Sequence, residues 1–144
     1  MSGAFVPGTE TTATLLYVED NLANLALVET ILLPRPTWRL VPALQGRLGL
    51  ELAQRHAPDL ILLDLHLPDL PGREVLRLLR ADPRTRRTPV VVITADATPG
   101  TAEALLAEGA TAFLTKPLDV RAFLSTVDRA LADATGAAAA GRTV

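Results

Sequence analysis

Short, unbroken hydrophobic runs recur along the chain and are separated by longer segments. The runs are Thr14–Val18, Trp38–Val41, Leu60–Leu63, Val90–Ile93 and Ala112–Leu114. Most of them are continuous rather than alternating between hydrophobic and polar residues. Continuous runs of this length are typical of strands that are buried on both faces of a parallel sheet.

The segments between these runs have the hydrophobic spacing of amphipathic helices. Helices are predicted after Asp20, over residues 46–56, 72–81 and 101–108, and after Asp119. Gly109 is placed to end the fourth helix, and Asp119 is placed to cap the fifth. Five strand–helix pairs predict a doubly wound α/β domain, with right-handed crossovers that put helices on both faces of the sheet.

The two ends of the chain differ from this core in composition. Residues 1–13 are rich in Thr, Gly and Pro, and residues 134–144 form an Ala/Gly-rich tail with little to bury. Both ends are predicted to be disordered, which leaves one domain over residues 14–133. The N-terminus lacks the charged start and apolar stretch of a signal peptide, so a cytoplasmic location is expected.

Charge and cysteine content narrow the possible functions. The chain has 14 Lys and Arg against 16 Asp and Glu, a net charge of −2, and no Cys. Without a basic excess or a basic amphipathic stretch, we expect neither nucleic-acid nor membrane binding. Without Cys, a disulfide or a thiolate metal site is impossible.

Polar residues follow four of the five predicted strands. Glu19 and Asp20 follow the first strand, Asp64 the third, Thr94 the fourth and Lys116 the fifth. Ligands of parallel α/β sheets bind at the carboxyl ends of the strands, so these side chains are predicted to converge. Carboxylates in one pocket repel each other unless a cation lies among them, and hard oxygen ligands suit Mg²⁺.

This set of residues fits phosphoryl chemistry. Asp64 is placed as a nucleophile that would form an acyl phosphate. A metal ion, the Lys116 ammonium and the Thr94 hydroxyl would stabilise charge on the transferring group. Taken singly, an acidic residue at a strand end more often caps a helix, and such a Thr or Lys more often has no chemical role. The combination at successive strand ends is what favours a functional site.

Four segments resemble, in the same order, the signature segments of response-regulator receiver domains. They are LLYVEDN, PDLILLDLHLP, VVVITADA and AFLTKPLD. The resemblance covers about residues 14–133. It implies a flavodoxin-like (βα)5 fold with strand order 2-1-3-4-5. It also implies a phosphoacceptor of a two-component phosphorelay, whose donor is a histidine kinase or a histidine phosphotransfer protein.

The resemblance assigns a phosphoacceptor and a Mg²⁺ site. Asp64 matches the phosphoacceptor, which is also a metal ligand. Glu19 and Asp20 match the acidic pair, with Asp20 as the direct ligand and Glu19 acting through water. The backbone carbonyl of His66 matches the remaining protein ligand.

The resemblance also assigns a switch. Lys116 matches the lysine that binds the phosphoryl group, and its bond to Pro117 resembles a peptide bond that is commonly cis in the family. Thr94 and Phe113 match the switch pair: phosphorylation would draw Thr94 toward the phosphoryl oxygen and let Phe113 turn inward. The responding surface would be the fourth helix, fifth strand and fifth helix.

Two more sets of residues have expected roles at the mouth of the pocket. The positions of His66 and Asp96 flank the phosphoryl group in the family and tune its lifetime, and a His66–Asp96 pair closing over the group is expected to slow hydrolysis. Asn21, Asn24 and Leu27 are candidates for docking the histidine donor. The alternative for Asn24 is a buried polar group bonded to the neighbouring loop.

The start of the first helix resembles receivers attached to hybrid kinases. The chain is therefore expected to be either a free-standing regulator or one domain of such a kinase, and a monomer or a phosphorylation-dependent homodimer. We expect no enzymatic activity beyond self-phosphorylation and self-dephosphorylation.

Three other functions stay open. A haloacid-dehalogenase-type phosphatase needs a second Asp two residues after the nucleophile, where this chain has His66. A flavodoxin-type cofactor binder needs a phosphate loop rich in Ser, Thr and Gly, where this chain has Glu19 and Asp20. The third is a receiver-like binding module that works without phosphorylation.

Overall fold

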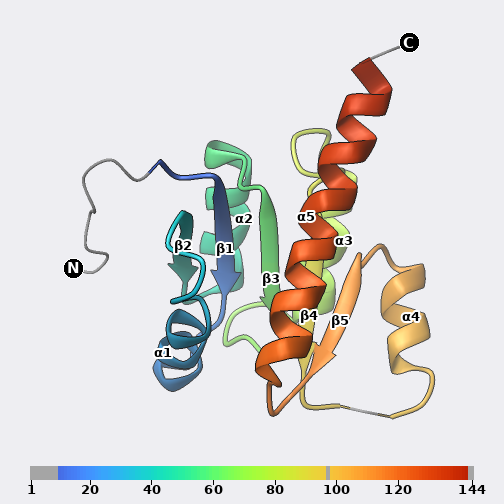
Figure 1. Ribbon diagram of the computed structural model, residues 1–144. Helices are drawn as coiled ribbons and strands as arrows, with labels where there is room; N and C mark the ends of the chain where they lie inside the picture. The colour runs from blue at the N-terminus through green and yellow to red at the C-terminus, as the bar shows by residue number, and fades with distance from the viewer. Residues whose placement is uncertain (1–9, 97, 143–144) are drawn as a thin grey trace.

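Five parallel strands and five helices alternate along the chain in the computed structural model, which describes residues 10–96 and 98–142. The strands are β1 (Ala13–Val18), β2 (Trp38–Ala43), β3 (Leu60–Asp64), β4 (Val90–Thr94) and β5 (Ala112–Thr115). The helices are α1 (Leu22–Ile31), α2 (Gly46–His56), α3 (Gly72–Ala81), α4 (Thr101–Ala107) and α5 (Val120–Arg142). The strand order is β2-β1-β3-β4-β5 and every pairing is parallel, which confirms the predicted flavodoxin-like fold (Figure 1).

Two hydrophobic clusters fill the two faces of the sheet. Alternate residues of β1 point to opposite faces, so Leu15 joins the cluster under α1 and α5, and Leu16 joins the cluster under α2, α3 and α4. Figure 1 shows α1 and α5 on one side of the sheet and α3 on the other. Every residue of β3 and of β4 is buried, as their continuous hydrophobic runs predicted.

Local signals fix the ends of several helices. The Asn21 side chain caps α1 by accepting a hydrogen bond from the backbone N–H of Asn24 at 3.0 Å. The Asp119 carboxylate accepts from the N–H of Ala122 at 2.8 Å, which confirms the predicted cap of α5. Gly109 follows α4 with a φ of +112°, a conformation that favours glycine, as expected of a residue that ends a helix.

The C-terminal segment differs from its prediction. Residues 134–142, predicted to belong to a disordered tail, are helical and form the end of α5, while residues 143–144 lie outside the described residues. Alanine has the highest intrinsic helix propensity, so an alanine-rich stretch can extend an existing helix. Of the segment 1–13, residues 1–9 also lie outside the described residues, and Ala13 is already part of β1. None of the described helices is long and apolar enough to cross a membrane.

Candidate functional site

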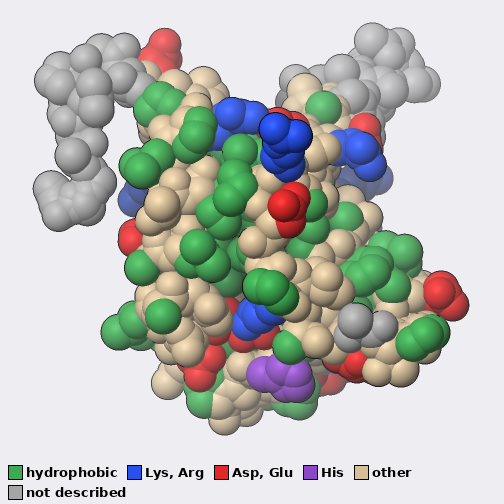
Figure 2. All heavy atoms as spheres, turned by 60° about the horizontal axis from the view of Figure 1, so that its bottom comes forward, with side chains coloured by type: hydrophobic (Ala, Val, Ile, Leu, Met, Phe, Trp, Pro, Cys, Tyr) green, Lys and Arg blue, Asp and Glu red, His purple; other side chains and the backbone are tan. Residues whose placement is uncertain are grey.

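The carboxyl ends of four strands bring the predicted site residues together. Asp64 and Thr94 are the last residues of β3 and β4, and Lys116 directly follows β5. The register pairs Val18 with Leu63 and Thr94 with Thr115, so the strands end at nearly the same level. In Figure 2, which turns this end of the molecule forward, acidic side chains surround a basic one.

Three carboxylates form the acidic part of the site. Glu19, Asp20 and Asp64 each offer an oxygen, and these oxygens lie within 4.8 Å of one another. Glu19 and Asp64 are buried, and Asp20 is exposed. Joint ionisation of three carboxylates at this spacing is costly unless a cation lies among them. The arrangement fits a Mg²⁺ ion, which prefers oxygen ligands and retains several waters.

Glu19 is the most heavily hydrogen-bonded of the three acids. Its Oε1 accepts from the Tyr17 hydroxyl at 3.1 Å, the Asn24 amide at 3.2 Å and the Lys116 ammonium at 3.4 Å. Its Oε2 accepts from the backbone N–H of Asn21 at 3.1 Å. A carboxylate with both oxygens engaged by protein donors fits contact with a metal through water better than direct coordination.

Tyr17 is a site residue that the sequence analysis missed. Its side chain is fully buried, and burial, followed by the charge and hydrogen bond of Glu19, raises the pKa of its hydroxyl above the ordinary range. The hydroxyl therefore stays protonated and remains a donor to Glu19. Glu19 directly follows β1, and residues two apart on an extended segment lie on the same side of it, so the Tyr-x-Glu spacing was the available signal.

Lys116 links two of the acids. Its ammonium nitrogen lies 3.4 Å from Glu19 Oε1 and 3.6 Å from Asp64 Oδ2. Its backbone N–H donates to the carbonyl oxygen of Thr94 at 2.8 Å, and its peptide bond to Pro117 is cis, as predicted. The ammonium thus offsets part of the negative charge around Asp64.

The phosphoacceptor candidate and the switch hydroxyl are both held by nearby backbone groups. Asp64 Oδ1 accepts a hydrogen bond from the backbone N–H of His66 at 3.2 Å, so the start of the loop after β3 contacts this carboxylate. The Thr94 hydroxyl oxygen is buried and accepts from the backbone N–H of Asp96 at 3.0 Å. Phe113, the other member of the switch pair, is half-buried against the cluster under α2, α3 and α4.

His66 and Asp96 form no ion pair within the described part of the chain. The His66 side chain is exposed. The Asp96 carboxylate instead accepts from the Thr98 N–H at 2.8 Å and the Thr101 hydroxyl at 3.3 Å. Hydrogen bonds from Thr98 are the main cause of its lowered pKa, and the charge of His66 contributes least. The described conformation therefore does not show the expected His66–Asp96 pair closed over the site.

The three docking candidates separate into two kinds. Leu27 is 44% exposed, and Asn21 is exposed at the start of α1. Asn24 is half-buried with its amide on Glu19, which matches the alternative of a polar group bonded to the neighbouring loop. The buried face of α1 is formed by Leu25, Val28 and Ile31.

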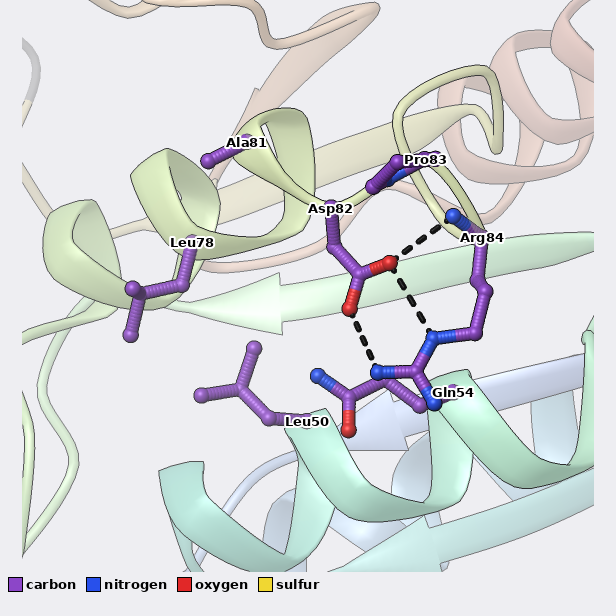
Figure 3. A pocket seen from close by; sticks show the side chains of 7 residues that line it. All are labelled: Leu50, Gln54, Leu78, Ala81, Asp82, Pro83 and Arg84. Atoms are coloured by element: carbon purple, nitrogen blue, oxygen red, sulfur yellow. Dashed lines mark hydrogen bonds and ion pairs between the residues drawn. The ribbon is translucent and has the colours of Figure 1, made fainter.

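A hollow lies between α2 and α3, at a distance from the carboxyl ends of the strands (Figure 3). Its wall contains Leu50 and Leu78 together with Asp82, whose carboxylate receives three hydrogen bonds from Arg84. Those bonds hold the pKa of Asp82 below its usual range. Asp82 is the one acidic residue among those lining this hollow, and its carboxylate is occupied by Arg84. The described lining residues therefore offer no free carboxylate for catalysis.

Comparison with known proteins agrees with this geometry. Residues 15–128 match the family model of the response regulator receiver domain. The polar-differentiation response regulator DivK of Brucella ovis is 36% identical over 123 residues, which cover 85% of this chain and 99% of DivK.

Solved structures of the same kind are similar as well. The receiver domain of a sensor histidine kinase from Pseudomonas aeruginosa is 31% identical, with a TM-score of 0.75 over 83% of this chain and 98% of that domain, and holds a magnesium ion in its active site cleft. The chemotaxis response regulator CheY4 of Vibrio cholerae is 28% identical, with a TM-score of 0.76 over 83% of this chain and 99% of CheY4.

Proposed function

This chain belongs to the response regulator receiver domain family of two-component signalling, and from that premise we propose that Asp64 accepts a phosphoryl group from a phosphohistidine in a Mg²⁺-dependent step. The observation that carries the proposal is the surrounding of Asp64. It is buried at the end of β3, with Glu19 and Asp20 oxygens within 4.8 Å and the Lys116 ammonium at 3.6 Å.

The transfer itself is a displacement at phosphorus. A carboxylate oxygen of Asp64 forms a bond to phosphorus while the bond from phosphorus to the imidazole nitrogen breaks, and the electron pair leaves with the imidazole. Lys116 binds one phosphoryl oxygen, and the Thr94 hydroxyl binds another. Asp20, Asp64 and the backbone carbonyl of His66 would hold a Mg²⁺ ion that neutralises developing charge, with Glu19 acting through water.

The signalling consequences form part of the same proposal. Movement of Thr94 would open space for Phe113 to turn inward and change the surface of α4, β5 and α5. On α4, Leu105 is fully buried and Leu106 is 46% exposed, so of these two leucines it is Leu106 that a partner or a second copy could contact. His66 and Asp96 would set the lifetime of the phosphoryl group. The domain would act in the cytoplasm as a phosphoacceptor, not as an enzyme with its own substrate.

The first prediction tests the chemistry directly. With MgCl₂ and acetyl phosphate, the protein is expected to gain one phosphoryl group, visible by intact-mass spectrometry and assigned to Asp64 by peptide mapping. A chelator such as EDTA should prevent the gain, because the carboxylates then lack the cation that offsets their charge. An unlabelled protein that still binds partners would instead support a phosphorylation-independent binding module. A labelled residue other than Asp64 would contradict the proposal.

The second prediction concerns docking of the histidine donor. Leu27→Ala should slow transfer from a phosphohistidine donor by about tenfold, because a donor that docks on α1 would bury this exposed side chain and the substitution removes the apolar area it buries. Labelling by acetyl phosphate should not change. Asn21→Ala is a poorer test, since removing the cap weakens α1 itself.

Leu33→Ala is the matched control for docking. Leu33 is 73% exposed and lies beyond the other end of α1, so its removal should leave both reactions unaltered. Equal slowing of both reactions in Leu27→Ala would count against docking and indicate damage to the pocket.

A further inference from the structure

The carboxylate of Glu19 accepts more hydrogen bonds than the one from Lys116, which already balances its charge. Only 1% of the residue is exposed, and its two oxygens receive four hydrogen bonds. Lys116 alone already supplies a counter-charge at 3.4 Å. Two neutral donors, Tyr17 and Asn24, converge on the same Oε1 from β1 and α1.

We propose that Tyr17 and Asn24 are positioning residues that hold Glu19 in the orientation needed to bind Mg²⁺ through water. The inference rests on the proposed function, because it assigns these residues to the metal step of that reaction. Under this proposal, Asn24 acts within the site and is no longer a candidate for docking the histidine donor.

The directions of the hydrogen bonds support this assignment. With Tyr17 and Asn24 present, Oε1 is shared among three donors and Oε2 stays on the Asn21 N–H. Without the two neutral donors, Lys116 is the one side-chain donor to Oε1 left among the described residues, so the carboxylate is free to turn toward the ammonium. It would then present a different edge to metal-bound water and compete with Asp64 for Lys116.

Both positioning residues are themselves held in place. The Tyr17 ring is fully buried in the cluster under α1 and α5, so Tyr17→Phe keeps the packing and removes only the hydroxyl. The backbone of Asn24 is tied to the Asn21 cap, so Asn24→Ala removes the amide without disturbing the first turn of α1. Each substitution therefore removes one hydrogen-bond donor to Glu19 and leaves the surrounding packing and the first turn of α1 unchanged.

The test measures Mg²⁺ affinity separately from phosphorylation. Amide resonances of the wild type, Tyr17→Phe, Asn24→Ala and the double variant are titrated with MgCl₂, and labelling by acetyl phosphate is followed at limiting and saturating Mg²⁺. Loss of an outer-shell partner typically weakens metal binding at least tenfold, so we expect each single variant to raise the Kd for Mg²⁺ by about tenfold. Labelling should slow at limiting Mg²⁺ and return to within about twofold of wild type at saturation.

A buried hydroxyl elsewhere provides the matched control. Thr85 is 1% exposed and donates to the carbonyl oxygen of Leu79 at 2.7 Å, away from the strand ends. Thr85→Val should lower stability through the lost hydrogen bond yet keep the wild-type Kd for Mg²⁺. The double variant at positions 17 and 24 should lose less than the product of the single effects, because both donors act on one oxygen.

Several results would overturn the inference. Folded variants with wild-type Mg²⁺ affinity would do so, as would an Asn24→Ala variant impaired only in transfer from a histidine donor, which would return that residue to docking. A wild type that binds Mg²⁺ but is never labelled would refute the proposed function. The inference about Tyr17 and Asn24 would then be decided by the Kd values for Mg²⁺ of the wild type and the variants alone. A wild type that does not bind Mg²⁺ would refute both.

Discussion

Asp64→Asn is expected to abolish phosphorylation by acetyl phosphate or a histidine donor while leaving the fold intact. The amide has nearly the shape of the carboxylate, and its oxygen can still accept the hydrogen bond from the His66 N–H. It has no charged nucleophilic oxygen, however, so the acyl phosphate cannot form. Intact-mass spectrometry with Mg²⁺ should show no gain of mass, which corresponds to a loss of at least about a thousandfold in labelling rate.

Asp128→Asn is a suitable control for Asp64→Asn. Asp128 lies on α5, where its carboxylate pairs with Arg35 at 2.9 Å, remote from the acidic site. The same chemical change there should leave labelling at the wild-type rate. Undiminished labelling of Asp64→Asn would remove Asp64 from the role of phosphoacceptor.

The strands were predictable because burial on both faces leaves a continuous hydrophobic signature. β2 is the instructive exception, since its predicted end at Val41 falls short of the observed end at Ala43. The intervening Pro42 argues against a central strand. β2 lies at the edge of the sheet, where a missing N–H is tolerated, and the position of a strand within the sheet cannot be read from its own hydrophobicity.

The sequence predicted those site residues whose place follows from the order of the strands. It did not predict contacts that depend on where a side chain points. Asp64 and Thr94 end their strands, so parallel topology alone brings them to one edge. The contact of Asn24 with Glu19 depends on the rotation of α1, which its local sequence does not specify. The Asp96 carboxylate likewise accepts hydrogen bonds from Thr98 and Thr101 and does not pair with His66. Donors two to five residues away along the chain are within reach without any further ordering of the chain.

The prediction with the largest expected effect on stability is at Gly72, the first residue of α3. A Cβ at this position would lie 2.4 Å from the carbonyl oxygen of Asp64 and 2.5 Å from the Cα of Leu65. Both atoms belong to the backbone that leaves β3, so no side-chain rotation can relieve the contact. Gly72→Ala is expected to lower the free energy of unfolding by about 3 kcal/mol, which corresponds to a fall in Tm of about 10 °C.

Gly100→Ala separates this clash from a general intolerance of alanine at glycine positions. Gly100 has a φ of +94° and no atom within 4 Å of the added Cβ, so only backbone strain of about 1 kcal/mol is expected there. Thermal unfolding of the two variants should therefore differ by several degrees, with Gly72→Ala the less stable. Because the displaced backbone carries Asp64, labelling of Gly72→Ala by acetyl phosphate should also slow at temperatures where it remains folded. A Gly72→Ala variant as stable as Gly100→Ala would mean that the start of α3 can move away from β3 at little cost.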